Sequence, residues 1–178
     1  MDKEEKIIFP DRYKVVGADL SLRRPGFSMI SVDKISGEIK VEKIISVNNK
    51  TSHKKTHGEL LEDIRYVFVK SFFPERNVFY VRETEVMHMK VPSERSLSKV
   101  VGLMDWLLWN LGQKEWHSIY PVTIKKLITG SGKAQKEEVA EGLEKYVGKL
   151  NYRCDDESDA VAVAIAWLIQ QGEIEEKI

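Results

Sequence analysis

The order of hydrophobic and polar positions changes along the chain from short apolar runs to longer segments with helical spacing. The first part holds three short runs rich in β-branched residues, separated by polar residues and by turn residues such as Gly37. Such runs are typical of strands, and the short connections between them favour an antiparallel meander. We therefore predict three strands, over residues 13–19, 26–32 and 39–47.

Helical periodicity follows in the middle of the chain. Apolar residues recur at intervals of three and four from about residue 56 to residue 71, which predicts a first helix. Residues 77–82 follow the breaker Pro74 and are predicted to form a fourth strand. A second amphipathic helix is predicted to open at Ser93 and to end at Gly112.

Two tryptophans do not fit the apolar stripe of this second helix. Trp106 and Trp109 lie off the stripe, which is unusual for a helix that faces a single core. Exposed aromatic residues are enriched at protein–protein interfaces. We therefore interpret both residues as part of a subunit interface.

The last third of the chain is mainly helical. Residues 116–120 are predicted to form a short fifth strand, and residues 121–128 a helix with proline at its first turn. After a Gly-Ser-Gly loop, residues 133–150 are predicted to be helical, and residues 157–170 form a helix that is apolar almost all round and needs cover on most sides. The order of elements predicts an α/β fold, with a mixed five-stranded sheet (β-β-β-α-β-α-β-α) and helices on both faces.

The composition describes one globular domain. The chain has 178 residues, 42% of them apolar and 31% charged, and is long enough to bury a substantial core. We expect residues 12–172 to form this domain, between a flexible lead-in over residues 1–11 and a polar tail over residues 173–178. No apolar run approaches the roughly 20 residues that span a bilayer. A single cysteine, Cys154, suits a reducing compartment, so the cytoplasm is the expected location.

The charge balance argues against one mode of nucleic-acid binding. The chain carries 28 basic and 28 acidic residues, so its formal net charge is zero. A protein of this kind does not attract nucleic acid through its overall field. A local basic surface that is offset by acidic residues elsewhere is still compatible with this balance.

Acidic residues stand at the ends of three predicted elements. Asp19 ends the first strand, Glu83 follows the fourth, and Asp156 and Asp159 lie on one face at the start of the last helix. Each has an ordinary explanation: a turn, a solvated loop, or complementation of the helix dipole. Glu85, two residues further on, would point to the same side of the strand as Glu83 and is the main alternative to it.

The combination of these acids is more informative than any one of them. They can converge only if the central strands are neighbours and the last helix lies across them. Carboxylates without histidine or cysteine suit Mg²⁺ or Mn²⁺ better than zinc. Paired metals of this kind stabilise the attacking and leaving oxygens in phosphodiester hydrolysis, so the pattern favours a metal-dependent nuclease.

At these residues the sequence resembles a known family. The segment Val16-Gly-Ala-Asp19-Leu-Ser, a strand that ends in Glu83, and the segment Asp156-Glu-Ser-Asp159-Ala-Val-Ala are similar to the RuvC-type Holliday-junction resolvases of the RNase H-like superfamily. Residues 120–136, with a helix, a Gly-x-Gly loop and a following lysine, support the same family. The resemblance extends from residue 15 to about residue 168, nearly the whole chain.

The resemblance implies a function and roles for individual residues. It implies a homodimeric, Mg²⁺-dependent endonuclease, with Mn²⁺ as a substitute, that resolves four-way DNA junctions in recombination and repair. The implied metal-binding catalytic acids are Asp19, Glu83, Asp156 and Asp159. Lys136 would lie near the scissile phosphate. The expected DNA contacts are Lys125, Lys126, Lys133, Lys136, Arg23, Arg24 and His88, all of which have surface charge or an ordinary loop as their alternative explanation.

Some positions depart from the family pattern. Asp19 is followed by Leu-Ser where Pro-Gly is common, a variation that resembles phage-type members. Arg82 precedes Glu83 where an apolar residue is usual, which leaves Glu85 open as the second ligand. Glycines 130 and 132 would let the backbone approach a phosphate.

Two other functions stay open at this point. A different RNase H-fold nuclease would act on RNA–DNA hybrids or on flaps, and a substrate panel separates this activity from junction resolution. A non-catalytic nucleic-acid-binding relative would usually have lost one of the four acids, and none is evidently missing here. A dimer with C2 symmetry and two active sites matches the near two-fold symmetry of a junction that must be cut on two strands.

Overall fold

Three antiparallel strands form one half of the sheet, as the apolar runs predict. They are β1 (Arg12–Asp19), β2 (Gly26–Asp33) and β3 (Glu38–Ser46). β1 pairs with β2 over its whole length, and β2 pairs with β3 around a bulge between Met29 and Ile30. The computed structural model describes residues 7–49, 54–73, 75–84, 92–113 and 116–177.

Two parallel strands complete the sheet on the other side of β1. They are β4 (Val78–Glu83), which pairs with β1, and β5 (His117–Ile119), which pairs with β4. The strand order is β3-β2-β1-β4-β5. β1 therefore lies at the centre, next to one antiparallel and one parallel neighbour, and the sheet is mixed as predicted.

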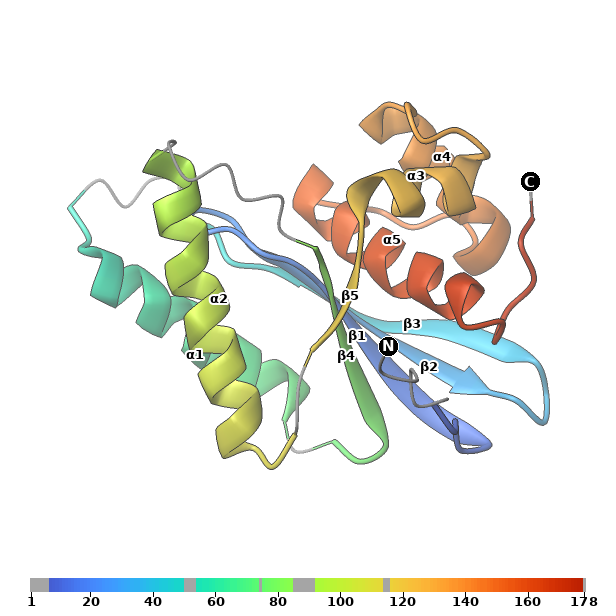
Figure 1. Cartoon of the computed structure of the whole chain (residues 1–178), viewed down its shortest axis with the longest axis horizontal. Coiled ribbons are helices and arrows are strands. Elements are labelled where there is room, and N and C mark those ends of the chain that lie inside the picture. Colours follow the sequence, from blue (N-terminus) through green and yellow to red (C-terminus); the bar gives the residue numbers. More distant parts are fainter. Residues whose placement is uncertain (1–6, 50–53, 74, 85–91, 114–115, 178) are drawn as a thin grey trace, which may run out of the picture.

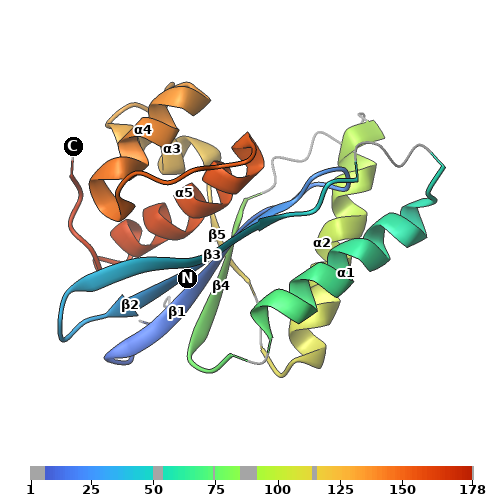
Figure 2. The same ribbon diagram turned by 180° about the vertical axis from the view of Figure 1, so that it is seen from behind.

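Helices cover both faces of the sheet (Figure 1). One face carries α1 (His57–Phe72) and α2 (Pro92–Asn110). The other carries α3 (Pro121–Thr129), α4 (Lys136–Val147) and α5 (Asp155–Gln170). Figure 2 shows from behind that α5 lies between the sheet and the pair α3 and α4.

The polar segment expected to be helical over residues 133–150 is a shorter helix. α4 begins only at Lys136, because Gln135 is its N-cap and donates its backbone N–H to the Glu138 carboxylate at 2.6 Å. It ends at Gly148, whose φ of 70° is accessible to glycine but unfavourable for other residues. Caps at both ends therefore set a length that periodicity alone overestimates.

Each face of the sheet has its own hydrophobic core. The core under α1 and α2 includes Phe27, Phe68 and Tyr80. The core under α5 includes Val15, Val81 and most residues of α5, from Val161 to Ile169. Because α5 is covered by the sheet on one side and by α3 and α4 on the other, its apolar character on all sides is accounted for.

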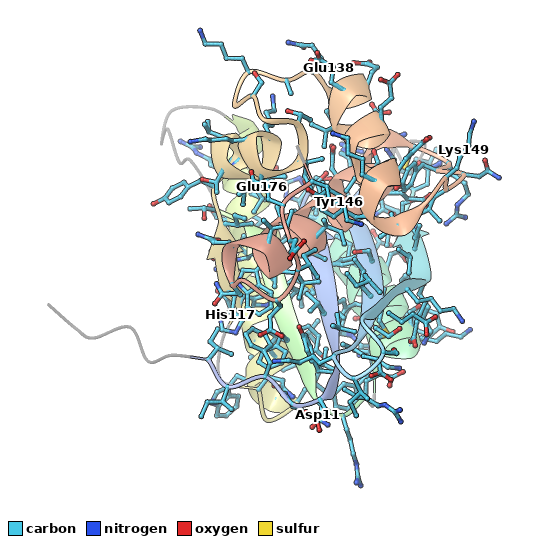
Figure 3. All side chains as sticks on the ribbon, turned by 90° about the vertical axis from the view of Figure 1, so that its right-hand side faces the viewer. Asp11, His117, Glu138, Tyr146, Lys149 and Glu176 are labelled. Atoms are coloured by element: carbon cyan, nitrogen blue, oxygen red, sulfur yellow. The ribbon has the colours of Figure 1, made fainter. Side chains whose placement is uncertain are left out.

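Residues just outside the sheet also contact the second core. The Phe9 ring, in the segment expected to be a lead-in, lies 4.8 Å from the Phe79 ring and 5.5 Å from that of Trp167. Residues 1–6 lie outside the described residues. Near the other end of the chain, Lys177 donates its backbone N–H to the Tyr146 hydroxyl at 2.8 Å, and Tyr146 is labelled in Figure 3. Among the described residues, no helix has the length and hydropathy needed to cross a membrane.

Candidate active site

Two carboxylates stand together at the ends of the central parallel strands. β1 and β4 are neighbours in register, with Ala18 opposite Arg82, so the next residues, Asp19 and Glu83, end the two strands at the same edge. Alternation places both side chains on the face that carries α5. The acidic residues of the sequence can converge only if these two strands are neighbours, and the structure meets this requirement.

The start of α5 is set against the sheet by close backbone contact. The Ser28 hydroxyl donates to the Ala160 carbonyl at 2.8 Å. A side chain on Gly17 would clash with this same carbonyl, and one on Gly26 would clash with the carbonyl of Asp156. Glycine at these two strand positions therefore lets the helix end, with its acidic residues, lie directly on β1 and β2.

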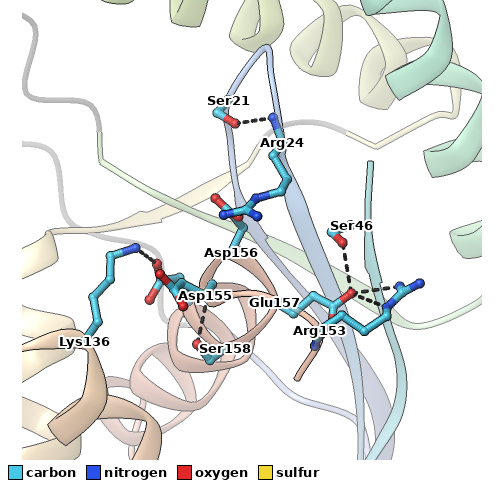
Figure 4. Close-up of polar contacts among 10 residues, drawn as sticks. Ser21, Arg24, Ser46, Lys136, Arg153, Asp155, Asp156, Glu157 and Ser158 are labelled. Carbon is cyan, nitrogen blue, oxygen red and sulfur yellow. Dashed lines mark hydrogen bonds and ion pairs between the residues drawn. The ribbon is translucent and has the colours of Figure 1, made fainter. Parts of the chain in front are cut away.

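A buried carboxylate outside the cavity anchors the same helix end. Glu157 is 2% exposed. Its oxygens accept hydrogen bonds from the Ser46 hydroxyl at 3.0 Å, from the Arg153 backbone N–H at 2.8 Å and from the Arg153 guanidinium at 2.9 Å (Figure 4). An acid at the start of a helix ordinarily does no more than complement the helix dipole. Its burial depends on long-range pairing with β3, which no local pattern reveals.

The strand-end carboxylates and Asp159 line one cavity of about 230 Å³. Lysines from two helices line it as well: Lys125 of α3, and Lys136 at the start of α4. The Lys136 ammonium donates to Asp159 Oδ2 at 2.6 Å. The remaining lining residues are Pro121, Ile124, Val139, Ala162 and Val163. The cavity thus brings together acidic and basic side chains from five separate elements.

Mutual repulsion and burial disfavour the ionised carboxylates. Burial first, and then the charges of Asp159 and Glu83, raise the pKa of Asp19 to about 7. Burial and the charge of Asp159 raise the pKa of Glu83, against the opposing effect of Lys136 and Lys125. Burial also raises the pKa of Asp159, although the Lys136 ammonium opposes this shift. A cation in the cavity would relieve this strain.

Asp156 lies beside the cavity and has its own cation. Its carboxylate forms an ion pair with the Arg24 guanidinium (Figure 4). Among the described residues, no three histidine, cysteine or acidic side chains gather tightly enough to hold one metal ion. The donor chemistry nevertheless suits a hard divalent cation, because all the available ligands are carboxylate oxygens. Two of these carboxylates are instead held by Lys136 and Arg24.

The other residues singled out in the sequence are distributed more widely. Lys126, Lys133 and Arg23 are exposed and do not line the cavity. His88 and Glu85 lie outside the described residues. Packing and backbone conformation within the protein account for glycine at positions 130 and 132, without a phosphate. Gly130 is the left-handed C-cap of α3, and a side chain on Gly132 would press against Val122.

Comparison with known proteins points to one family. Residues 15–167 match the family described as Crossover junction endodeoxyribonuclease RuvC. The protein of that name from Ehrlichia ruminantium (strain Gardel) is 32% identical over 155 residues, which cover 85% of this chain and 93% of the relative.

Solved structures agree on the fold. The Thermus thermophilus RuvC structure has a TM-score of 0.74 and 20% identity, covering 89% of this chain and 96% of that chain. T. thermophilus RuvC in complex with Holliday junction substrate has a TM-score of 0.71 at 20% identity, covering 86% and 92%. The predicted α/β fold of the RNase H-like type is confirmed.

Proposed function

Because the chain belongs to the crossover junction endodeoxyribonuclease RuvC family, we propose that it is a Mg²⁺-dependent endonuclease that resolves four-way DNA junctions. The family resemblance stated from the sequence is confirmed. Membership of a nuclease family makes phosphodiester hydrolysis the reaction class. The metal, the site residues and the dimer are the parts of this proposal that experiments must test.

One observation supports the catalytic proposal above all others. Asp19, Glu83 and Asp159 come from two strands and a helix far apart in the sequence, yet they line one cavity with Lys125 and Lys136. A fold gains no stability from placing carboxylates where burial and repulsion raise their pKa values. Such an arrangement is typical of a site that is completed by a cation.

The carboxylates would hold the metal ions, and the lysines would act on the DNA. Asp19, Glu83 and Asp159 would hold them from within the cavity, with Asp156 joining from beside it. A bound divalent ion would polarise the scissile phosphodiester and stabilise the charge that develops on the attacking and leaving oxygens. Lys136, now bonded to Asp159, would turn its ammonium to the scissile phosphate.

Further basic residues would position the junction without reading its sequence. Lys125 faces the cavity, whereas Lys126, Lys133 and Arg23 are exposed. Contacts from such residues to phosphates fix the register of the DNA and weaken with added salt. The zero net charge of the chain makes a local basic surface of this kind necessary for DNA binding.

A homodimer through α2 would supply the second active site. Trp106 is 55% exposed and Trp109 is 72% exposed, whereas Met104 and Leu108 of the same helix are buried in the core. Gly102 lies on the same side of the helix as the two tryptophans, four and seven residues before them, and is open to solvent. An exposed aromatic stripe beside a glycine suits close packing against a second copy of α2.

The test is cleavage of a synthetic four-way junction by the wild-type protein and by Asp19→Asn. With Mg²⁺ the wild type should produce symmetric paired nicks, and the variant none, while both bind the junction in Ca²⁺. Asp155→Asn is the matched control, because Asp155 is an exposed acid in the first turn of α5. Retained cleavage by Asp19→Asn would refute the site assignment. A panel with RNA–DNA hybrid and flap substrates tests the alternative substrate classes.

A further inference from the structure

Arg24 is held in a fixed position between the sheet and the start of α5. It lies in the connection between β1 and β2, where its backbone N–H donates to the Ser21 hydroxyl at 3.0 Å. The preceding carbonyl, of Arg23, accepts the Asn49 backbone N–H at 2.8 Å. The peptide group between Arg23 and Arg24 is therefore hydrogen-bonded through both its N–H and its carbonyl, and the Arg24 side chain extends toward Asp156 at the start of α5 (Figure 4).

The ion pair that Arg24 makes with Asp156 is shielded from water. The Arg24 side chain is 26% exposed and that of Asp156 is 18% exposed. The contacting atoms, Arg24 Nε and Asp156 Oδ2, are buried, and among the described residues neither has a hydrogen-bond partner besides the other. The two groups therefore depend on each other for charge compensation, and separating them is costly unless each gains a new partner of opposite charge.

This pair lies within the electrostatic field of the acidic cavity. The charge of Asp156 acts on both Asp19 and Asp159. A guanidinium cannot ligate a metal ion, because it has no lone pair to donate, and its positive charge repels a cation nearby. While Arg24 is bound to Asp156, it therefore lowers the attraction of the whole cluster for a divalent ion.

We propose that Arg24 is a positioning residue that couples metal binding to DNA binding at this site. Without DNA, its guanidinium holds Asp156 and weakens the affinity for metal. When DNA is bound, a backbone phosphate offers Arg24 another anion, and Asp156 becomes available to the metal. This inference rests on the proposed function for its metal and its DNA, but it assigns to Arg24 a role beyond that of an ordinary phosphate contact.

Two measurements test the coupling with different probes. The first is the affinity of the DNA-free protein for Mn²⁺, followed by the electron paramagnetic resonance signal of the free ion. The second is the gain in affinity for a labelled four-way junction when Ca²⁺ is added, followed by fluorescence anisotropy. Linkage requires that DNA and metal strengthen each other's binding by the same factor. A variant that already binds metal more tightly without DNA should therefore gain less junction affinity when metal is added.

Arg24→Gln is the test variant and Arg76→Gln its control. Both remove one positive charge, but Arg76 is exposed, precedes β4 at the strand end opposite Glu83, and lies outside the contact with Asp156. Arg24→Gln should bind Mn²⁺ about five- to tenfold more tightly than the wild type, at the lower end of typical coupling between ligands. The gain in junction affinity that Ca²⁺ gives to Arg24→Gln should shrink by a similar factor. Arg76→Gln should stay within about twofold of the wild type in both measurements.

The outcomes separate this inference from the proposed function. If the wild type binds Mn²⁺ but folded Arg24→Gln binds it equally or more weakly, Arg24 does not oppose metal binding and the coupling is refuted, while the proposed metal site stands. If the wild type binds no Mn²⁺ with or without junction DNA, the metal site and the coupling both fail. Thermal unfolding of each variant by circular dichroism establishes that it is folded. Arg24→Lys, which keeps the charge, should retain most of the wild-type behaviour.

Discussion

Asp19 differs from an ordinary surface aspartate in two ways, because it is buried and it lies close to other carboxylates. It ends a strand whose preceding residues belong to the core, and it faces other carboxylates, which together raise its pKa from 3.8 to about 7. The energetic cost of this arrangement falls on the metal-free protein. We therefore expect the carboxylate that makes the site suitable for a cation to lower the free energy of unfolding of the metal-free protein.

The pH dependence of stability should reveal this cost. Between pH 3.8 and about 7 the folded protein keeps a proton on Asp19 that the unfolded chain releases. The free energy of unfolding should therefore fall as the pH rises through this window, by at most about 4 kcal/mol. In Asp19→Asn the side chain at this position cannot ionise, so the free energy of unfolding of the variant should fall less over the same pH window. Denaturant unfolding in EDTA at pH 5 and pH 8 measures both slopes.

Added Mg²⁺ provides the complementary observation. At pH 8 it should raise the unfolding temperature of the wild type, because an ion that binds only the folded state stabilises it. It should do so less for Asp19→Asn. Equal pH slopes for the two proteins in EDTA, together with equal responses to Mg²⁺, would show that Asp19 is neither strained nor a ligand.

Individual residues differ in how far the sequence could reveal them. Asp19 and Glu83 could be anticipated, because each ends a readable strand, and alternation predicts the face on which it lies. The partner of Arg24 could not: the sequence suggests a phosphate contact, but the structure shows an ion pair with Asp156, 132 positions away along the chain. Side-chain partners of this kind depend on the packing of α5 against the β1–β2 turn, which has no local signature.

At the element scale, the position of α5 on the sheet sets the geometry of the acids. Its contact with β1 and β2 is unusually close, because glycines face the carbonyls of Ala160 and Asp156. A larger residue at these strand positions must push the start of α5 away from the sheet. The acids of its first turns would then move relative to Asp19 and Glu83.

Gly26→Ala tests this dependence. The added Cβ would clash with the Asp156 carbonyl, which is backbone and cannot rotate away. We expect a loss of about 1–3 kcal/mol in the free energy of unfolding, and a larger loss of cleavage than this destabilisation explains. Gly58→Ala, near the start of α1, is the control, because a Cβ at this position would approach only the Thr56 hydroxyl, at an ordinary contact distance of 3.8 Å.

The control should be neutral or slightly stabilising, since alanine favours a helix more than glycine by up to about 1 kcal/mol. Urea unfolding gives the stabilities, and junction cleavage well below the unfolding midpoint gives the activities. If Gly26→Ala is as stable and as active as Gly58→Ala, the close approach of α5 does not position the acids.

Elements were easier to predict than their lengths and contacts. The strands and helices are found where hydrophobic periodicity indicates, because that periodicity is the direct consequence of which face each element buries. Periodicity alone overestimates the length of α4, since its caps at Gln135 and Gly148 are set by hydrogen bonds and a backbone angle. The anchoring of α5 through Glu157 depends on β3 and could not be anticipated from its own helix.

At the scale of the whole molecule, the two faces of the sheet have different tasks. Helices α3, α4 and α5 lie on one face and α1 and α2 on the opposite face (Figure 1). Residues on the first face line the cavity, and α2 on the second carries the exposed tryptophans. A dimer through α2 would therefore leave both cavities open to DNA. This separation lets oligomerisation and cleavage be altered independently.

Trp109→Glu should convert the proposed dimer into a monomer. A carboxylate at a side chain that is 72% exposed in the single chain leaves the fold intact, but it places two like charges at a two-fold interface, where their desolvation is unfavourable. Sedimentation velocity would show the change in mass. On a four-way junction the monomer should give single nicks in place of symmetric paired nicks.

Ile35→Glu is the appropriate control, because Ile35 is 73% exposed in the connection between β2 and β3, away from α2. It should keep the mass and the paired nicks of the wild type. A Trp109→Glu protein that sediments as the wild type and still cuts both strands together would place the interface elsewhere. Single nicks from a monomer with intact Mn²⁺ binding would instead show that each active site is complete within one chain, and that the dimer serves to coordinate the two cuts.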